Sequence, residues 1–286
     1  MTVIPTTPPT PAYAHVPSST WSLPAQFTAL DCFKIGKFAD GQSNLAVVTG
    51  VPGSASATIS APAAQPTTSV PSWNNDTDAV IQLLYPAGSV NPGSELQGGV
   101  DLYANPLPMK DAHNVTMEYS VFIDKDFDFV KGGKLPGLYG GHMGCSGGNI
   151  ASDCFSTRLM WRPDGAGELY LYVEQSKQLP SLCSTPPLSV CDSDYGLSIG
   201  RGSFHWARGQ WTHVRQTVRL NTPGIPDGGF TLDVNGNRVI TLDSVFYRSP
   251  RILTPCDSFF GGHDASWATP RDQYMWFKDF ALAVNN

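Results

Sequence analysis

Two neighbouring segments, residues 155–162 and 168–175, carry polar side chains at every second position. These side chains are Ser156, Arg158, Tyr170, Tyr172 and Glu174. Because side chains alternate across a β-strand, all five fall on one face if the segments form a hairpin. A guanidinium stays charged and binds a carboxylate through two hydrogen bonds, whereas a phenol can stack on a sugar or move a proton. The combination predicts a site for an acidic sugar.

The other face of the same hairpin is apolar. It carries Phe155, Leu159, Trp161, Leu169, Leu171 and Val173, which we expect in the core. If Arg162 faces Glu168 across the turn, Arg158 lies opposite Tyr172 and Ser156 lies opposite Glu174. A half-exposed sheet often has a polar outer face without any function. Phenols beside a guanidinium differ from the Thr, Ser and Lys residues usual there, and favour a functional face.

A glycine-rich loop precedes the hairpin and adds positive charge. Residues 131–137 have the sequence KGGKLPG, in which glycine and proline favour tight turns. We expect Lys134 to face the same site as a second cation. The next loop, residues 140–145, carries His142, which either lines the cleft or bonds to backbone.

Three charged residues are further candidates for substrate binding. His213 and Arg215 share one face of an alternating segment at 211–221, where they either extend the cationic floor or face solvent. Glu174 either orients Arg158 or forms an ordinary surface ion pair.

Several other side chains have weaker functional interpretations. Sugar platforms or core positions are expected for Trp206, Trp211, Trp267 and Tyr274. His263 and Asp264 are weak candidates for the border of a subsite. An alternating acidic run resembles a calcium cluster only weakly, and a solvated strand edge fits it better; it comprises Asp124, Asp126 and Asp128.

The elements that position these residues are expected to be strands. The chain is 41% apolar and only 15% charged, with 28 Gly and 24 Pro, a mixture of short apolar runs and turn formers. No segment has a helical period over three turns. Strands are predicted at residues 79–85, 114–124, 155–162, 168–175, 211–221, 229–234, 237–242 and 273–284, with an Asn-Gly turn at 235–236. We predict an all-β antiparallel β-sandwich of the jelly-roll type.

The domain organisation is expected to be simple. Residues 1–20 are rich in Pro and Thr and form a flexible segment ahead of a single catalytic domain at 21–286. A biased stretch at residues 50–72 is flanked by apolar segments, which indicates a long loop inside that domain. Residues 1–20 also lack the apolar run of a signal peptide, so we expect any such leader to have been removed.

Cysteine usage indicates an extracellular protein. The six cysteines contain no CxxC pair, which favours disulfides over zinc. The expected bridges are Cys145–Cys154, Cys183–Cys191 and Cys32–Cys256. Two sequons, at Asn75 and Asn114, suit a secreted glycoprotein. The chain has no transmembrane run, and its net charge of −6 gives no reason to expect nucleic acid. We expect a monomer that binds neither nucleic acid nor membranes.

The runs FVKGGKLPGLYGG, FSTRLMWR and ELYLY together resemble polysaccharide lyase family 14, as do GQWTHVRQTVRLN and FFGGHDASWA. The resemblance covers residues 75–286. It implies a concanavalin-like jelly roll that cleaves glucuronan or alginate by β-elimination. It also implies an active-site set at Lys134, Ser156, Arg158, Tyr170 and Tyr172. No cofactor is implied, because Arg and Lys can neutralise the substrate, although a structural calcium is compatible with it.

Two other functions share the expected fold. A lectin-like binding module has the aromatics but does not need the whole cationic and phenolic set. A retaining glycoside hydrolase needs two carboxylates about 5–5.5 Å apart, and the hairpin face offers only Glu174. The sequence has no GxSxG elbow. It leaves open which of Lys134, Tyr170 and Tyr172 is the base, which polyuronate is cleaved, and whether cleavage is endo or exo.

Overall fold

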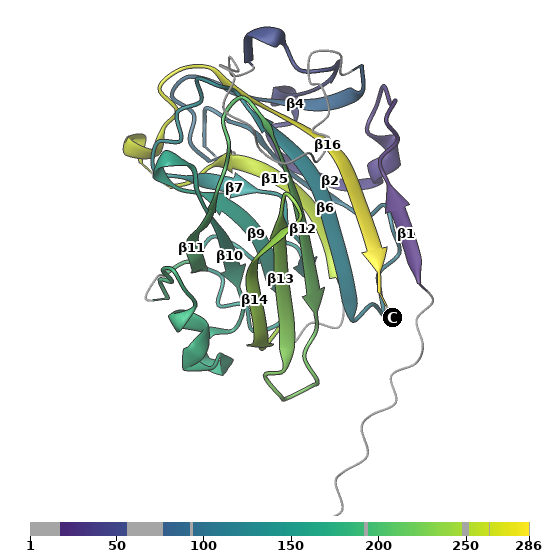
Figure 1. The fold of residues 1–286 in the computed structure, drawn as a ribbon, viewed down its shortest axis with the longest axis vertical. Coiled ribbons are helices and arrows are strands. Elements are labelled where there is room, and N and C mark those ends of the chain that lie inside the picture. Colours follow the sequence, from purple (N-terminus) through teal and green to yellow (C-terminus); the bar gives the residue numbers. More distant parts are fainter. Residues whose placement is uncertain are drawn as a thin grey trace, which may run out of the picture.

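The computed structural model describes residues 18–55, 77–91, 94–191, 194–247, 252–262 and 264–285, and leaves out the side chains of 252–257 and 259–260. Two antiparallel eight-stranded sheets pack face to face (Figure 1). The supporting sheet has the order β14 (Asn237–Val245), β13 (Gly228–Val234), β12 (Trp211–Arg219), β6 (Asn114–Ile123), β16 (Gln273–Val284), β4 (Ala79–Tyr85) and β3 (Leu45–Thr49), and β1 (Ser19–Ser22) pairs with β16.

The second sheet carries the candidate site, and we call it the site sheet. Its order is β11 (Leu197–His205), β10 (Ala166–Tyr172), β9 (Phe155–Trp161), β7 (Gly133–Leu135), β15 (Ile252–Phe260), β5 (Val100–Ala104) and β2 (Ile35–Asp40), and β8 (Tyr139–Gly140) pairs with β9 and β15. The described helical turns are all short 3-10 segments: η1 (Asp31–Phe33), η2 (Gln42–Asn44), η3 (Gly53–Ala55), η5 (Pro163–Gly165), η6 (Gln175–Lys177), η7 (Pro180–Ser184) and η8 (Ala265–Trp267). This architecture confirms the predicted all-β sandwich.

The core lies between the inner faces of the two sheets. All six hairpin residues expected there are buried in it: Phe155, Leu159, Trp161, Leu169, Leu171 and Val173. On the supporting sheet, Val214 and Val218 of β12 point inward while Arg215 and Arg219 are exposed. Burial of the apolar face of each strand is therefore the main force that holds the layers together.

The sequence predicted eight of the strands, all of them with a clear apolar or alternating pattern. The others are short or interrupted, and β7 and β8 have only three and two residues. In β11, Gly200 and Gly202 have positive φ values of 63° and 85° and interrupt the alternation. Such segments become strands because neighbouring strands supply their hydrogen bonds, which a local pattern does not reveal. The Asn235–Gly236 turn is confirmed, with positive φ at both residues.

Two of the three expected disulfides are confirmed, Cys145–Cys154 and Cys183–Cys191. The third, Cys32–Cys256, is wrong, because Cys32 carries a free thiol. Cys32 precedes β2, and β5 separates β2 from the strand that holds Cys256. The two cysteines therefore belong to segments that are not neighbours in the sheet. The side chain of Cys256 lies outside the described residues.

The chain termini bear on the predicted domain boundary. β1 begins at Ser19, two residues inside the segment expected to precede the domain, and pairs with the C-terminal strand (Figure 1). Residues 1–17, most of the 50–72 stretch and Asn75 lie outside the described residues. The second sequon residue, Asn114, opens β6 and accepts a hydrogen bond from Asn285. Within the described part of the chain, no helix is long and apolar enough to span a membrane.

Candidate active site

A cavity of about 570 Å³ opens on the outer face of the site sheet. This volume is in the range of small-ligand sites. Its lining contains the cations Lys134, Arg158 and Arg162, the phenols Tyr170, Tyr172 and Tyr195, the carboxylates Asp40, Asp101 and Asp264, and the indole of Trp267. The predicted Lys, Arg and paired tyrosines therefore share one cavity.

The hairpin register differs from the expected one by two residues. Arg158 lies opposite Tyr170, and Ser156 lies opposite Tyr172. The turn is tighter than expected: Ala166 already belongs to β10, and its carbonyl accepts a hydrogen bond from the Arg162 amide. Because the shift is an even number of residues, every side chain stays on its expected face.

Arg158 lies between two phenol rings and is only 2% exposed. Its guanidinium carbon is 5.6 Å from the ring centre of Tyr139 and 5.7 Å from that of Tyr172. A cation is attracted to the negative face of an aromatic ring, and more strongly where water is excluded. The rings therefore hold the guanidinium at the cavity floor.

Lys134 is the second buried cation and is 8% exposed. It lies on β7, which pairs with both β9 and β15. Its Nζ lies 4.1 Å from the ring centre of Tyr170 and donates to Sδ of Met160 at 3.5 Å. The structure thus brings Lys134 beside the hairpin face, as predicted from the glycine-rich loop.

The sequence of that loop has a steric reason. A Cβ on Gly137 would lie 2.4 Å from the Thr157 carbonyl oxygen and 2.5 Å from Cα of Arg158. Only glycine allows the chain to pass this close to β9. The close approach brings the segment after Lys134 directly against the strand that carries the guanidinium.

A buried polar bridge between the sheets fixes the same segment. The Pro136 carbonyl accepts hydrogen bonds from the Tyr119 hydroxyl at 3.2 Å and the Gln216 amide at 3.3 Å. Gln216 in turn accepts a hydrogen bond from Thr157 at 2.8 Å. A buried polar group without a hydrogen bond destabilises the fold, so these bonds restrict the segment to one conformation. They attach residues 131–137, which we call the Lys134 loop, to both sheets.

The two catalytic tyrosine candidates meet edge to face, with ring centres 5.8 Å apart. Burial raises the pKa of Tyr170 well above its ordinary value, and the neighbouring Tyr172 adds to the rise. Arg162 and Arg158 oppose that rise but do not overcome it. Tyr172 differs in that its hydroxyl oxygen accepts a hydrogen bond from the Gly148 amide at 3.3 Å.

Gly196 packs against both rings, although no sequence motif singles it out. A Cβ there would lie 2.6 Å from Cε2 of Tyr172 and 3.0 Å from Cε1 of Tyr170. This glycine precedes β11 and forms one wall of the tyrosine pair. The sequence did not predict this contact because it depends on β10 and β11 being neighbours in the sheet.

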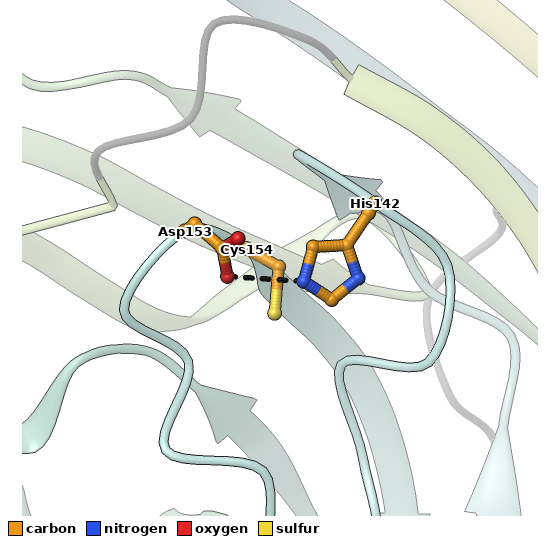
Figure 2. Close-up of side chains that lie close together, drawn as sticks. All are labelled: His142, Asp153 and Cys154. Atoms are coloured by element: carbon orange, nitrogen blue, oxygen red, sulfur yellow. Dashed lines mark hydrogen bonds and ion pairs between the residues drawn. The ribbon is translucent and has the colours of Figure 1, made fainter.

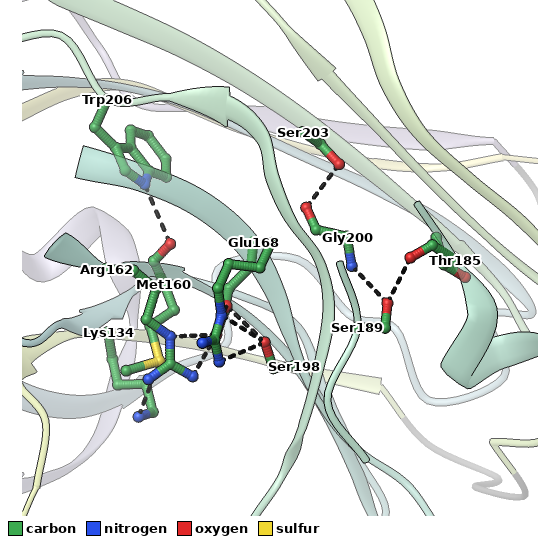
Figure 3. A network of polar contacts seen from close by, with 11 residues as sticks. Lys134, Met160, Arg162, Glu168, Thr185, Ser189, Ser198, Gly200, Ser203 and Trp206 are labelled. Atoms are coloured by element: carbon green, nitrogen blue, oxygen red, sulfur yellow. Dashed lines mark hydrogen bonds and ion pairs between the residues drawn. The ribbon is translucent and has the colours of Figure 1, made fainter. Parts of the chain in front are cut away.

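A buried ion cluster lies beside the tyrosines. Glu168 is fully buried, and its two carboxylate oxygens receive Arg162 at 2.6 Å and Arg201 at 2.8 Å. Ser198 donates to the same carboxylate at 2.6 Å. Figure 3 shows Glu168 facing Arg162 and Ser198, with Lys134 and Met160 close by. Arg162 and Glu168 form an ion pair, but the expectation that they face each other across the hairpin is wrong, because Glu168 lies opposite Met160.

The opposite end of the cavity is acidic. Asp40 on β2 and Asp101 on β5 face each other across neighbouring strands. In the strand order, β5 is two strands from β7 and β2 is three. The cavity therefore has cations over β7, β9 and β10 and carboxylates over β5 and β2. No sequence motif indicated these aspartates. Because Asp40 lines the cavity, a strand from the N-terminal part of the domain contributes to the site.

The sequence matches the model of a known enzyme family. A family model described as Polysaccharide lyase 14 matches residues 73–280. The chain belongs to the polysaccharide lyase 14 family. This finding confirms the family expected from the sequence motifs, and with it the enzyme class, a polysaccharide lyase.

Solved structures of similar fold include other lyases. A crystal structure of a PL-14 alginate lyase from Aplysia kurodai has a TM-score of 0.73 and 28% identity, and the match covers 93% of this chain and 98% of that one. The endo-β-1,4-glucuronan lyase of the fungus Trichoderma reesei shares the fold, with a TM-score of 0.51, 10% identity, and coverage of 88% and 91%.

A curated relative is also similar. It is Exolysin of Paramecium bursaria Chlorella virus 1, which is 27% identical over 166 residues, half of this chain. This chain spans about a quarter of that protein's length, since the match covers 24% of it.

Two of the expected substrate-binding residues of this family 14 member lie outside the cavity lining. Ser156 is fully buried and donates to the Cys145 carbonyl at 3.0 Å. Its hydroxyl thus anchors the neighbouring loop. Glu174 follows the end of β10 and accepts a hydrogen bond from Ser176, so the expectation that it orients Arg158 is wrong.

His142 also lies outside the cavity lining. Its ring bonds to the Met143 carbonyl at 2.7 Å and to Asp153 at 3.0 Å, and these two partners raise its pKa (Figure 2). Cys154 lies close enough to complete a three-ligand group. Its sulfur is bonded to Cys145, so it is not the thiolate that a metal needs. The histidine therefore fastens the base of a loop.

His213 and Arg215 lie on the supporting sheet, on the far side of the sandwich from the cavity. Both pair with Glu118, at 3.3 and 3.0 Å. The expectation that they extend the cationic floor is wrong. The alternating pattern of β12 correctly predicted that both side chains lie on an outer face. It did not predict to which of the two sheets β12 belongs.

The aromatic and acidic candidates divide between cavity and core. Trp267 lines the cavity, with the Lys131 ammonium 5.9 Å from its ring. Two other tryptophans, Trp206 and Trp211, are buried in the core, and Tyr274 stacks on Trp276 of the supporting sheet. Asp264 lines the cavity, whereas His263 lies outside the described residues.

The acidic run resembling a calcium cluster has local partners. Asp124 and Asp128 accept hydrogen bonds from nearby backbone amides. Asp126 pairs with Lys125. These contacts agree with the interpretation of a solvated strand edge.

Removing the buried carboxylate should destabilise the fold. Glu168→Leu leaves Arg162 and Arg201 without their shared anion, so we expect a loss of about 3–5 kcal/mol in the free energy of unfolding. Asp233→Asn, which breaks the half-exposed pair with Arg238, is the control, with an expected loss below about 1 kcal/mol. Urea unfolding measures both. Equal losses of unfolding free energy in the two variants would show that the buried Glu168 cluster stabilises the fold no more than a half-exposed ion pair.

A methyl group at Gly196 should displace the tyrosine pair. We expect Gly196→Ala to lower kcat by about 10- to 100-fold, since small misplacements of reacting groups have effects of that size. Gly53→Ala is the matched control, because a Cβ there meets no atom within 4 Å. Steady-state kinetics on a polyuronate measures the effect. Unchanged kcat in Gly196→Ala would mean that the ring positions do not matter.

Proposed function

We propose that this chain cleaves 1,4-linked polyuronates by β-elimination and leaves an unsaturated uronate at the new chain end. The observation that carries the proposal is the packing of two buried cations, Lys134 and Arg158, against the phenol rings of Tyr170 and Tyr172 in one cavity. Elimination needs a neutralised carboxylate, a base and an acid, and this set supplies all three.

The two cations have the role of neutralising the uronate. Arg158 and Lys134 bind the C6 carboxylate, and their charge withdraws electron density from C5 and makes its proton more acidic. Because both cations are preorganised in a nearly dry site, they stabilise the developing negative charge strongly. The reaction therefore needs no cofactor for this step.

The two tyrosines divide the proton transfers. Tyr172, whose oxygen already accepts the Gly148 amide, takes the C5 proton. The electron pair forms the C4–C5 double bond and the C4–O4 bond breaks. Tyr170, which burial keeps protonated, gives its proton to O4 of the leaving sugar. This assignment follows the difference in environment between two otherwise identical groups.

The substrate class is a polyuronate, either alginate or glucuronan. The similar structures are named as an alginate lyase and a glucuronan lyase, and both polymers present the same C6 carboxylate to the cationic end of the cavity. The two disulfides are typical of extracellular proteins. We therefore place the protein outside the cell, as a monomeric single-domain enzyme acting on an acidic polysaccharide.

Hydrolysis is the rival reaction, because Asp40 and Asp101 are a facing carboxylate pair in the cavity. They lie on β2 and β5, which are three and two strands from β7 in the sheet, and their negative charge would repel a uronate carboxylate. A hydrolase releases saturated ends, a lyase releases unsaturated ends that absorb in the ultraviolet, and a lectin releases neither. Asp101→Asn should therefore retain formation of the unsaturated product.

Loss of a proposed catalytic group should abolish most activity. We expect Lys134→Ala and Tyr172→Phe each to lower kcat/KM at least about 100-fold, the scale of a lost proton-transfer or charge-stabilising group. The matched control is Arg215→Ala, which removes a cation from the opposite sheet and should leave kcat/KM close to that of the parent. The assay is ultraviolet absorbance on a panel of polyuronates. Substantial activity in both site variants would refute the proposed roles.

The pH dependence should be neutral to alkaline. A proton donor works in its protonated form, which exists below its pKa, and burial raises the pKa of Tyr170 above the ordinary phenol value of about 10. We expect kcat/KM to be highest at neutral to alkaline pH and to hold until above about pH 10. A pH–rate profile checks this. An optimum below about pH 5 would instead point to a carboxylate as the base.

A further inference from the structure

The loop between β8 and β9, residues 141–154, covers one edge of the tyrosine pair. We propose that this loop, closed by the Cys145–Cys154 disulfide, is a positioning element that holds the Tyr172 oxygen in place for proton transfer through a backbone amide. The inference rests on the proposed function, since it gives the loop a part in the same elimination.

The disulfide makes an exposed loop rigid near the site. Cys145 and Cys154 are both fully buried, whereas residues 147–150 are exposed. The Cα atoms of the bridge are 5.8 Å apart, and Cys154 directly precedes β9. Cys145, Ala151 and Cys154 pack in a buried apolar cluster with the aromatic side chains of the site, and the covalent bond and hydrogen bonds hold the exposed part of the loop.

Three hydrogen bonds connect this loop to the site sheet. The Ser156 hydroxyl donates to the Cys145 carbonyl at 3.0 Å. The amide of Gly144 donates to the Tyr103 hydroxyl at 3.3 Å. The amide of Gly148 donates to the Tyr172 hydroxyl oxygen at 3.3 Å. The first two fasten the loop, and the third transmits its position to the proposed base.

The surroundings of Tyr172 leave its ring little freedom. Gly196 packs against one edge of the ring, and the Gly148 amide faces its oxygen. The charged and titratable groups beside it are Arg158, 5.7 Å from the ring, and Tyr170, at 5.8 Å, with Tyr195 lining the same cavity. Arg158 and the amide both favour negative charge on the phenol oxygen.

A backbone N–H binds an anionic oxygen more strongly than a neutral one. The contact from Gly148 is therefore worth most when Tyr172 is ready to accept the C5 proton. A loosened loop loses this contact, and the base then needs a higher pH to reach its reactive form. Ser156, expected from the family motif to touch substrate, acts in this scheme as the anchor of the loop.

The decisive experiment compares two local disulfides. Cys145→Ser with Cys154→Ser opens the site loop, and the matched control, Cys183→Ser with Cys191→Ser, opens a loop of similar length away from Tyr172. We expect the first pair to lower kcat about tenfold and move the acid limb of the pH–rate profile up by about one unit, the scale of one lost charge-assisted hydrogen bond. The control pair should leave the acid limb in place, even if it lowers the melting temperature.

Two further measurements keep the inference testable if the serine pair folds poorly. Reduction of the folded parent with a phosphine reductant should reproduce the shift of the acid limb. Ser156→Ala should shift it in the same direction, and Ser156→Thr, which retains a hydroxyl, should restore it in part. An unmoved limb on reduction, or an equal shift in the control pair, would overturn the inference.

Failure of the proposed function is distinguishable from failure of this inference. If the parent protein releases no unsaturated product, the proposed function is wrong. Ultraviolet titration of the phenols, with Tyr172→Phe as the reference, tests the loop without any activity. Opening the Cys145–Cys154 bridge should move the titration of Tyr172 to higher pH, and no movement would count against the loop alone.

Discussion

The site depends on two cations held nearly out of water against phenol rings. A buried charge is costly unless it has favourable partners, and the faces of Tyr139, Tyr170 and Tyr172 are among the partners of Lys134 and Arg158. Two positive charges held this close together at one cavity attract a carboxylate more strongly than a neutral sugar.

The surroundings of these cations are built from both faces of one sheet. Below them the apolar side of the hairpin packs into the core, and the Thr157–Gln216–Pro136 bridge ties the Lys134 loop to the supporting sheet. Beside them the Glu168 cluster fixes Arg162. The rigidity of the sandwich is thus passed to side chains that must keep their geometry during proton transfer.

Positive and negative side chains lie in different parts of the cavity. Cations lie over β7, β9 and β10, while Asp40 and Asp101 lie over β2 and β5. An acidic polymer is drawn to one end and repelled at the other, so its carboxylates and its hydroxyl groups are expected to meet different parts of the lining. Loops then add their own control, because the Gly148 amide reaches the phenol that the sheet presents.

The sequence by itself determined the face of each hairpin residue, because alternation has a period of two and survives a register shift of two residues. Family motifs also identified Lys134, Arg158, Tyr170 and Tyr172. Only the tertiary structure decided the partners that depend on strand order. It joined Glu168 to Arg201 and brought Asp40 into the cavity. It also placed Arg215 on the opposite sheet, since alternation records two faces but not the layer to which a strand belongs.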